Sequence, residues 1–459
     1  MSAERPHPPS VEAILAVVRR RATVPREPEA LLGVAREVVA QERGRLTEGE
    51  EARAIGELAD AIARRLDGFE AIESAGPVAV INATGVIVHT NLGRAPWPAA
   101  AIRAAADLAG GYLLLELDRD SGRRGARFRV AEDHLIALTG AEDALVTNNN
   151  AAAVALAVAL AGRGGGVLVS RGELVEIGGG VRVPEIVRRA GARLIEVGTT
   201  NRTRIADFEA PLVEGRARVV LRVHPSNFTM AGFTESPDPL GLADLAHRHG
   251  AIVVDDLGSG ALLPTETFGL DHEPMPAERL AAGADVVTFS GDKLVGGPQA
   301  GLVVGRADLI ARMRRDPLAR AMRPDKATLA AVAATLGLYR AGRAVETIPV
   351  WRMIASPTAS IRVRAESVAT ALGGPPVAEV IAVESTVGGG SLPGQTLPSF
   401  GITLASRSAA RTLAALRRGR PSVIGRIADG RVVLDLRIVD PGDDDRLASA
   451  VARVLESPA

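Results

Sequence analysis

From about residue 76 onward, the sequence alternates between short apolar runs rich in β-branched residues and longer helical patterns rich in alanine. Apolar strands separated by helices are typical of a mainly parallel sheet that is covered on both faces. In such an α/β fold, ligands bind outside the carboxyl ends of the strands, so the residues that close each strand are the candidate site residues. The strands predicted in this way are 144–147, 166–170, 193–197, 218–222, 251–254, 286–290 and 301–304.

The two ends of the chain differ from this central part. Residues 1–75 carry apolar side chains at helical spacing and predict a small helical domain, with Gly44 marking a break near its third helical stretch. Residues 76–330 form the predicted large α/β domain. Residues 331–459 mix helical patterns with strand-like runs and predict a smaller α+β domain.

Composition excludes several classes of function. The 459 residues include no cysteine, which excludes disulfide frameworks, thiolate metal sites and cysteine nucleophiles. Lysine plus arginine and aspartate plus glutamate both total 54, so a polyanion must meet a local basic patch. The longest apolar stretch, 151–161, is far shorter than the ~20 residues of a spanning helix, and residues 1–10 lack the apolar run of a signal peptide. We therefore expect a cytoplasmic protein without a membrane segment and without a metal site.

Polar segments follow three of the predicted strands. In the first, Asn148, Asn149 and Asn150 precede an alanine-rich helix, whose free N–H groups suit an anion, although an ordinary asparagine cap gives the same pattern. In the second, Asp255 and Asp256 close a strand. A buried carboxylate there needs a cation or a protonated nitrogen opposite it, whereas a loop or capping aspartate needs neither. The sequence leaves open which of the two aspartates points inward.

The third segment places Lys293 in a loop of small residues just after the strand 286–290. A lysine in a tight, glycine-rich loop suits a Schiff base, and a solvated loop lysine is the alternative. A helix-start anion site, a strand-end aspartate and a strand-end lysine together match the phosphate, ring nitrogen and aldehyde of pyridoxal 5′-phosphate. The motifs of dinucleotide, P-loop and zinc-peptidase sites are absent from the sequence.

Longer stretches resemble a known family. Residues 81–94 (INATGVIVHTNLGR), 198–203 (GTTNRT), 224–228 (HPSNF), 256–260 (DLGSG) and 290–293 (SGDK) closely resemble the bacterial selenocysteine synthases, which are L-seryl-tRNA(Sec) selenium transferases. The motifs are long, keep the expected order and run over nearly the whole chain. The resemblance implies a fold-type-I transferase that depends on pyridoxal phosphate.

In this family, as the resemblance implies, seryl-tRNA(Sec) loses its β-hydroxyl through a cofactor-bound aminoacrylyl intermediate. Selenophosphate then supplies selenium, and the product is selenocysteinyl-tRNA(Sec). Lys293 would hold the cofactor and remove the Cα proton, and Asp256 would pair with the pyridine nitrogen, with Asp255 as the alternative. The cofactor phosphate would lie at Ser290 and at residues 148–151.

Selenophosphate is a small anion, and binding it calls for fixed arginines. The resemblance assigns this role to Arg94, Arg320 and Arg323, and it places Thr199 and Thr200 in the same pocket. On the sequence alone, Arg320 and Arg323 also fit a solvated helix face. Further candidates near the substrate or cofactor are Arg123, Arg124, Arg127 and His89.

The resemblance also implies partners. The domain 1–75 would bind the tRNA, and the subunits would form a ring of dimers, a decamer, with active sites at the dimer interfaces. Because the charge of this domain is balanced, recognition would depend on shape and on a few arginines such as 19–21, which equally fit a solvated helix end. One alternative is a pyridoxal phosphate-dependent lyase for a small amino acid or amino sugar acid, which would usually lack the helical domain. The other is a tRNA-binding protein with an inactive cofactor site, against which Lys293 and Asp256 argue.

Overall fold

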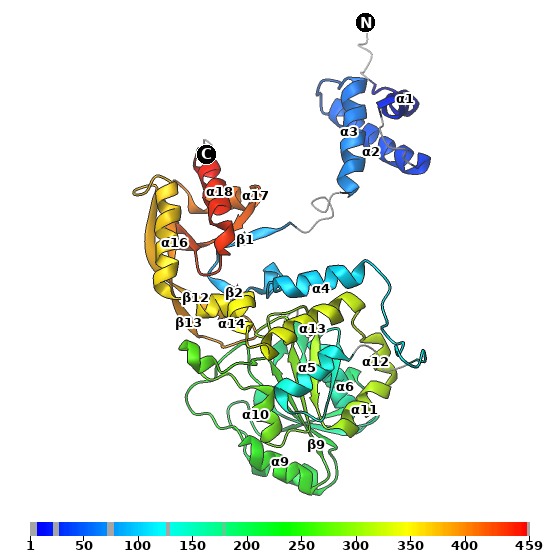
Figure 1. The fold of residues 1–459 in the computed structure, drawn as a ribbon, viewed down its shortest axis with the longest axis vertical. Coiled ribbons are helices and arrows are strands. Elements are labelled where there is room, and N and C mark those ends of the chain that lie inside the picture. Colours follow the sequence, from blue (N-terminus) through cyan, green and yellow to red (C-terminus); the bar gives the residue numbers. More distant parts are fainter. Residues whose placement is uncertain (1–6, 22–26, 71–77, 125–128, 178–179, 457–459) are drawn as a thin grey trace. The chain divides into compact units, whose positions relative to one another are not determined.

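The computed structural model describes residues 7–21, 27–70, 78–124, 129–177 and 180–456, and it divides into two compact units, residues 1–80 and 81–459 (Figure 1).

Three helices pack around a core of their own in the first unit: α1 (Val11–Arg21), α2 (Pro28–Thr47) and α3 (Ile55–Glu70). They lie in the segment for which the sequence predicted helices. The predicted break at Gly44 is wrong, because Gly44 lies inside α2. One glycine costs a helix only about 1 kcal/mol, and the apolar face of α2, which includes Val34 and Val38, is buried in the core.

A seven-stranded sheet forms the centre of the second unit, in the order β3-β11-β10-β9-β8-β4-β7. Neighbouring strands are parallel except around β11, which is antiparallel to β10 and to β3. The prediction of a mainly parallel α/β fold is therefore confirmed. The strands are β3 (Asp143–Thr147), β4 (Gly166–Ser170), β7 (Arg193–Val197), β8 (Val219–Val223), β9 (Ile252–Gly258), β10 (Val286–Ser290) and β11 (Gly301–Gly305).

Helices cover both faces of this sheet (Figure 1). Successive residues of β10 belong to different cores, because side chains alternate between the faces of a strand. Val287 packs in the core that contains Leu135, whereas Val286 packs in the core that contains Leu156. The helices of this region are α4 (Ala99–Ala109), α5 (Val130–Thr139), α6 (Asn150–Ala159), α7 (Val183–Arg189), α8 (Ile205–Val213), α9 (Pro239–Arg248), α10 (Pro276–Ala281), α11 (Ala307–Arg315), α12 (Pro317–Ala321) and α13 (Lys326–Arg340).

A second sheet of five strands has the order β15-β16-β13-β12-β2. Its edge strand β2 lies within residues 76–330, the segment that was predicted to form the large domain. The domain boundary at residue 330 stays a prediction. The strands are β2 (Val86–Val88), β12 (Ala378–Gly388), β13 (Thr396–Leu404), β15 (Arg426–Ala428) and β16 (Arg431–Asp435), with β14 (Ser422–Ile424) beside β1 (Val80–Asn82). Helices α16 (Thr358–Ala371), α17 (Ala409–Arg418) and α18 (Asp444–Glu456) pack in the core of this sheet. Helices α14 (Ala344–Thr347) and α15 (Pro349–Ala355) belong to the core of the central sheet that contains Leu135.

Within the described residues, no helix combines the length and the apolar character that crossing a bilayer requires.

Candidate active site

A cavity of about 280 Å³ lies at the carboxyl ends of β9 and β10, where α6 begins. This is the position at which ligands bind in sheets of this kind. Seven of the residues singled out in the sequence line it: Arg94, Asn149, Asn150, Ala151, Asp256, Ser290 and Lys293.

Lys293 lies in the loop between β10 and β11, and its amine is largely buried. Two glycines with left-handed backbone, Gly258 and Gly390, enclose it, with φ of 69° and 82°. A Cβ at Gly390 would lie 2.6 Å from Lys293 Cε and closer still to Nζ, and a Cβ at Gly258 would lie 3.6 Å from Nζ. Burial lowers the pKa of Lys293, and the Asp256 carboxylate partly opposes this effect. The site therefore favours a neutral, closely confined amine.

Asp256 receives its hydrogen bonds at one oxygen. Asn150 Nδ2 donates to Asp256 Oδ1 at 2.7 Å, and Thr288 Oγ1 donates to the same oxygen at 3.0 Å. Thr288 reaches it because β10 pairs with β9 in a register that sets Thr288 opposite Asp256. Burial raises the pKa of Asp256, and the two hydrogen bonds oppose that rise. No described residue donates to Oδ2, which leaves this oxygen available to a protonated ring nitrogen.

Asp255 lines a different cavity, one that contains Arg222 and Arg279. Arg279 Nε lies 3.6 Å from Asp255 Oδ2. Burial raises the pKa of Asp255, and Arg279 and Arg222 oppose the rise. The two adjacent aspartates thus line different cavities, and Asp256 shares its cavity with Lys293.

The start of α6 forms another part of the cavity wall. Asn149 caps this helix, since its side-chain oxygen accepts a hydrogen bond from Ala152 N at 2.9 Å. Asn150 Oδ1 is buried without a hydrogen-bond partner among the described residues. Asn148 does not line the cavity. It is exposed, and its backbone N–H donates to Met322 O.

Arg94 stands at the rim of the cavity in a left-handed conformation, with φ of 64°. Its Nη1 lies 2.9 Å from Oδ2 of Asp292, the residue before Lys293. The predicted threonines lie elsewhere. Thr199 Oγ1 donates to Arg202 O at 2.8 Å, and Thr200 lines the cavity of Asp255.

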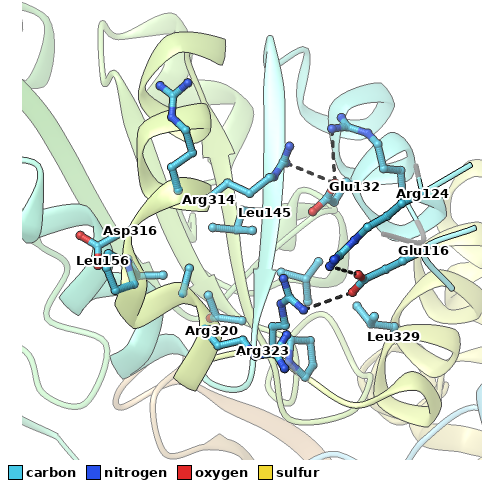
Figure 2. Close-up of a pocket in the computed structure, with 17 residues that line it drawn as sticks. Glu116, Arg124, Glu132, Leu145, Leu156, Arg314, Asp316, Arg320, Arg323 and Leu329 are labelled. Carbon is cyan, nitrogen blue, oxygen red and sulfur yellow. Dashed lines mark hydrogen bonds and ion pairs between the residues drawn. The ribbon is translucent and has the colours of Figure 1, made fainter. Parts of the chain in front are cut away.

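Arg320 and Arg323 line a separate cavity of about 420 Å³. Figure 2 shows Glu116 between Arg124 and Arg323, with Arg124 Nη2 at 2.6 Å from Oε2 and Arg323 Nη1 at 3.1 Å from Oε1. Within one chain, therefore, this arginine pair and Lys293 do not share a cavity. Arg127 lies outside the described residues.

Several cavity residues carried no predicted role. Gly389 and Gly390 line the cavity and belong to a run of three glycines that could have drawn notice. Thr288 does not line the cavity, and its contact with Asp256 follows only from the strand register. Ser226 also lines the cavity, and it lies in the HPSNF stretch that contributes to the family resemblance. His89 does not line the cavity, and its Nδ1 is buried without a partner among the described residues.

The arrangement is that of an α/β enzyme fold shared with the solved structure of D-glucosaminate-6-phosphate ammonia-lyase. The two superimpose with a TM-score of 0.60 at 21% identity, over 84% of this chain and 97% of that one. The L-seryl-tRNA selenium transferase family model matches residues 80–440. The L-seryl-tRNA(Sec) selenium transferases of Moorella thermoacetica and Hyphomonas neptunium are 47% and 45% identical, over 82% and 84% of this chain and equal shares of their own. The chain belongs to the L-seryl-tRNA selenium transferase family, which confirms the resemblance seen in the sequence.

Proposed function

We propose that this chain is a cytoplasmic transferase that converts seryl-tRNA(Sec) to selenocysteinyl-tRNA(Sec), with pyridoxal 5′-phosphate as its cofactor and selenophosphate as the selenium donor. One observation carries the proposal. In a chain of the selenium transferase family, a buried lysine shares a cavity with a buried aspartate at the carboxyl edge of the sheet.

The residues of the cavity fit pyridoxal 5′-phosphate. Lys293 Nζ provides the amine for the aldehyde, Asp256 Oδ2 lacks a donor among the described residues, and the start of α6 with Ser290 suits a phosphate. The bound cofactor supplies an electron sink for the charge that develops at the substrate Cα.

Side chains of this chain are proposed to transfer the protons, to hold the cofactor and to bind the selenium donor. Lys293, whose burial favours the neutral amine, would take the Cα proton at Nζ and deliver a proton to the β-hydroxyl as it leaves as water. Asp256, held by Asn150 and Thr288, would present its carboxylate to the ring nitrogen. Arg94, fixed by Asp292, presents a guanidinium to anionic selenophosphate at the rim of the cavity.

We propose that Arg320 and Arg323 of one subunit contribute to the active site of a second copy of the chain. We place them, with Thr199 and Thr200, at active sites completed between subunits of a homo-oligomer, a ring of dimers that forms a decamer. A divalent or trivalent anion favours several arginines over Arg94 alone, and this supports the placement. The helices of residues 1–75 are proposed to bind the tRNA.

A visible absorption spectrum of the purified protein, titrated with seryl-tRNA(Sec), tests the function. We expect a band of lysine-bound pyridoxal phosphate that shifts when the charged tRNA is added. A band that ignores the tRNA would reassign the cavity to a lyase for a small amino acid or amino sugar acid. A colourless protein that still binds tRNA would point to an inactive cofactor site.

Lys293→Ala separates chemistry from binding. The variant should lose turnover, because it lacks the amine that holds the cofactor and moves the proton, and it should bind tRNA nearly as the wild type does. Filter binding and single-turnover assays on the same preparation measure both. Equal loss of turnover and tRNA binding would mean that Lys293 is structural.

A further inference from the structure

A basic groove of about 850 Å³ lies along α17 and α18, far in sequence from the site residues described above. The two helices pack against each other near the carboxyl end of the chain (Figure 1). Among its described lining residues, Glu456 is the one acidic side chain. The arginines that line it are Arg407, Arg411, Arg418, Arg420 and Arg453.

Two of these arginines, Arg411 and Arg418, lie on the same side of α17. Leu416 is buried in the apolar core of the small sheet. Arg411 and Arg418 are seven residues apart, which is two helical turns and about 10 Å along the axis. Both side chains are exposed, and neither forms an ion pair with a described residue. Arg417, the next residue along, is also exposed but does not line the groove.

Several arginines elsewhere in the chain form ion pairs with carboxylates at short range. Arg323 and Arg124 share Glu116, and Arg94 pairs with Asp292. Arg407, Arg411 and Arg418 have no such partner within the described residues. In a chain of zero net charge, the groove is therefore a local positive surface of the kind that a polyanion requires.

We infer that this groove binds the phosphate backbone of the tRNA substrate, at a distance from the reacting serine. The inference rests on the proposed function, which makes tRNA the substrate. Two guanidinium groups set two turns apart can contact separate phosphates of one polymer, and each can bind a phosphate through a planar pair of N–H donors. No aromatic residue is among the described residues that line the groove. The groove would therefore bind the tRNA through its backbone charge and shape and not by stacking on bases.

The test compares Arg411→Gln/Arg418→Gln with Arg417→Gln, which removes one exposed charge from the same helix outside the groove. The probe is uncharged tRNA(Sec) transcript, and filter binding is repeated over a series of salt concentrations. For the double variant we expect about a tenfold loss of affinity at low salt and a fall of about 2 in the slope of log affinity against log salt. Arg417→Gln should match the wild type, and the cofactor absorption band should be the same in all three proteins.

Other results overturn the inference. Unchanged affinity and slope in the double variant, with tight binding by the wild type, would remove the groove from tRNA binding and leave the proposed function intact. Equal losses in the double variant and in Arg417→Gln would mean that the overall charge of α17 matters, and not the groove. A wild-type protein that holds the cofactor but binds no tRNA would overturn the proposed function together with the groove.

Discussion

At the scale of single residues, the room around the Lys293 amine is set by a glycine from a distant segment. β12 pairs in parallel with β2, with Gly388 opposite Val88. The chain then continues through Gly389 to Gly390, whose Cα faces the Lys293 side chain closely enough that a Cβ would overlap it. The reactivity of the lysine thus depends on the small sheet as well as on its own loop.

Gly390→Ala should therefore impair cofactor attachment. The new methyl group would push Nζ out of place, and we expect at least about a tenfold loss of the lysine-bound cofactor absorption, equivalent to about 1.4 kcal/mol. Gly394→Ala is the matched control. Gly394 has a similar φ of 79°, but nothing lies within 4 Å of its Cβ position. That variant should show only the ~1 kcal/mol strain of a left-handed alanine and keep its absorption. Equal cofactor loss in both variants would show that backbone strain, not the methyl group, is responsible.

Residue patterns located several candidate site residues, but they did not predict how these residues are arranged. Lys293, Asp256 and the asparagine segment could be singled out because each follows an apolar run. The choice between Asp255 and Asp256 needs the face of β9 that each occupies, and adjacent residues of a buried strand look alike in sequence. The role of Thr288 could not be predicted from the sequence for a related reason, because its contact with Asp256 arises only from the strand register.

At the scale of elements, the seven strands of the central sheet were predictable because each is a short apolar run between helical patterns. The direction of β11 was not. An apolar run such as Gly301–Gly305 reads the same in a parallel or an antiparallel strand, and the short loop after β10 is what turns the chain back. The edge position of β2 was also hidden, since it depends on pairing with a segment far along the chain.

Helix α5 carries a carboxylate whose ionisation should affect stability. Glu132 lies 3.3 Å from Arg314 and 3.6 Å from Arg129, yet burial raises its pKa from 4.5 to about 7 (Figure 2). The folded state therefore binds more protons than the unfolded state between about pH 4.5 and pH 7. Folding stability should fall as pH rises through this window, by about 3 kcal/mol in total.

Glu132→Gln should remove that pH dependence. Denaturant unfolding at about pH 5 and about pH 8 should show a smaller loss of unfolding free energy in the variant than in the wild type. Asp143 pairs with both arginines and continues to do so in the variant. Asp133→Asn, which changes an exposed carboxylate on the same helix, is the control and should follow the wild type. Parallel pH profiles for wild type and Glu132→Gln would contradict the prediction.

At the scale of the whole molecule, the surfaces proposed for chemistry and for tRNA binding come from different segments of the chain. The Lys293 cavity, the cavity of Arg320 and Arg323, and the basic groove all belong to residues 81–459. The helices α1 to α3 have a separate core, and none of the described residues that line these three cavities comes from them. Of the three adjacent arginines there, Arg19 pairs with Glu12 and Arg21 with Asp60, which favours a solvated helix end over a phosphate site.

Deletion of residues 1–70 tests how tRNA binding divides between the two units. Because residues 81–459 contain the Lys293 cavity and its supporting cores, the truncated protein should keep the cofactor absorption band. Its tRNA affinity should fall by at least about tenfold, and what remains should still depend on salt through the groove. Unchanged affinity in filter binding would remove the tRNA role from the helices.

The truncation also gives a sharper test when it is combined with Arg411→Gln/Arg418→Gln. If the helices and the groove contact different parts of one tRNA, their losses of binding free energy should add, because separate sites without shared partners are independent. The combined protein would then bind more weakly than the wild type by the product of the two fold-changes. A combined loss no larger than that of the truncation would mean that the groove acts only when the helices have placed the tRNA. The two contacts would then be energetically coupled and not independent.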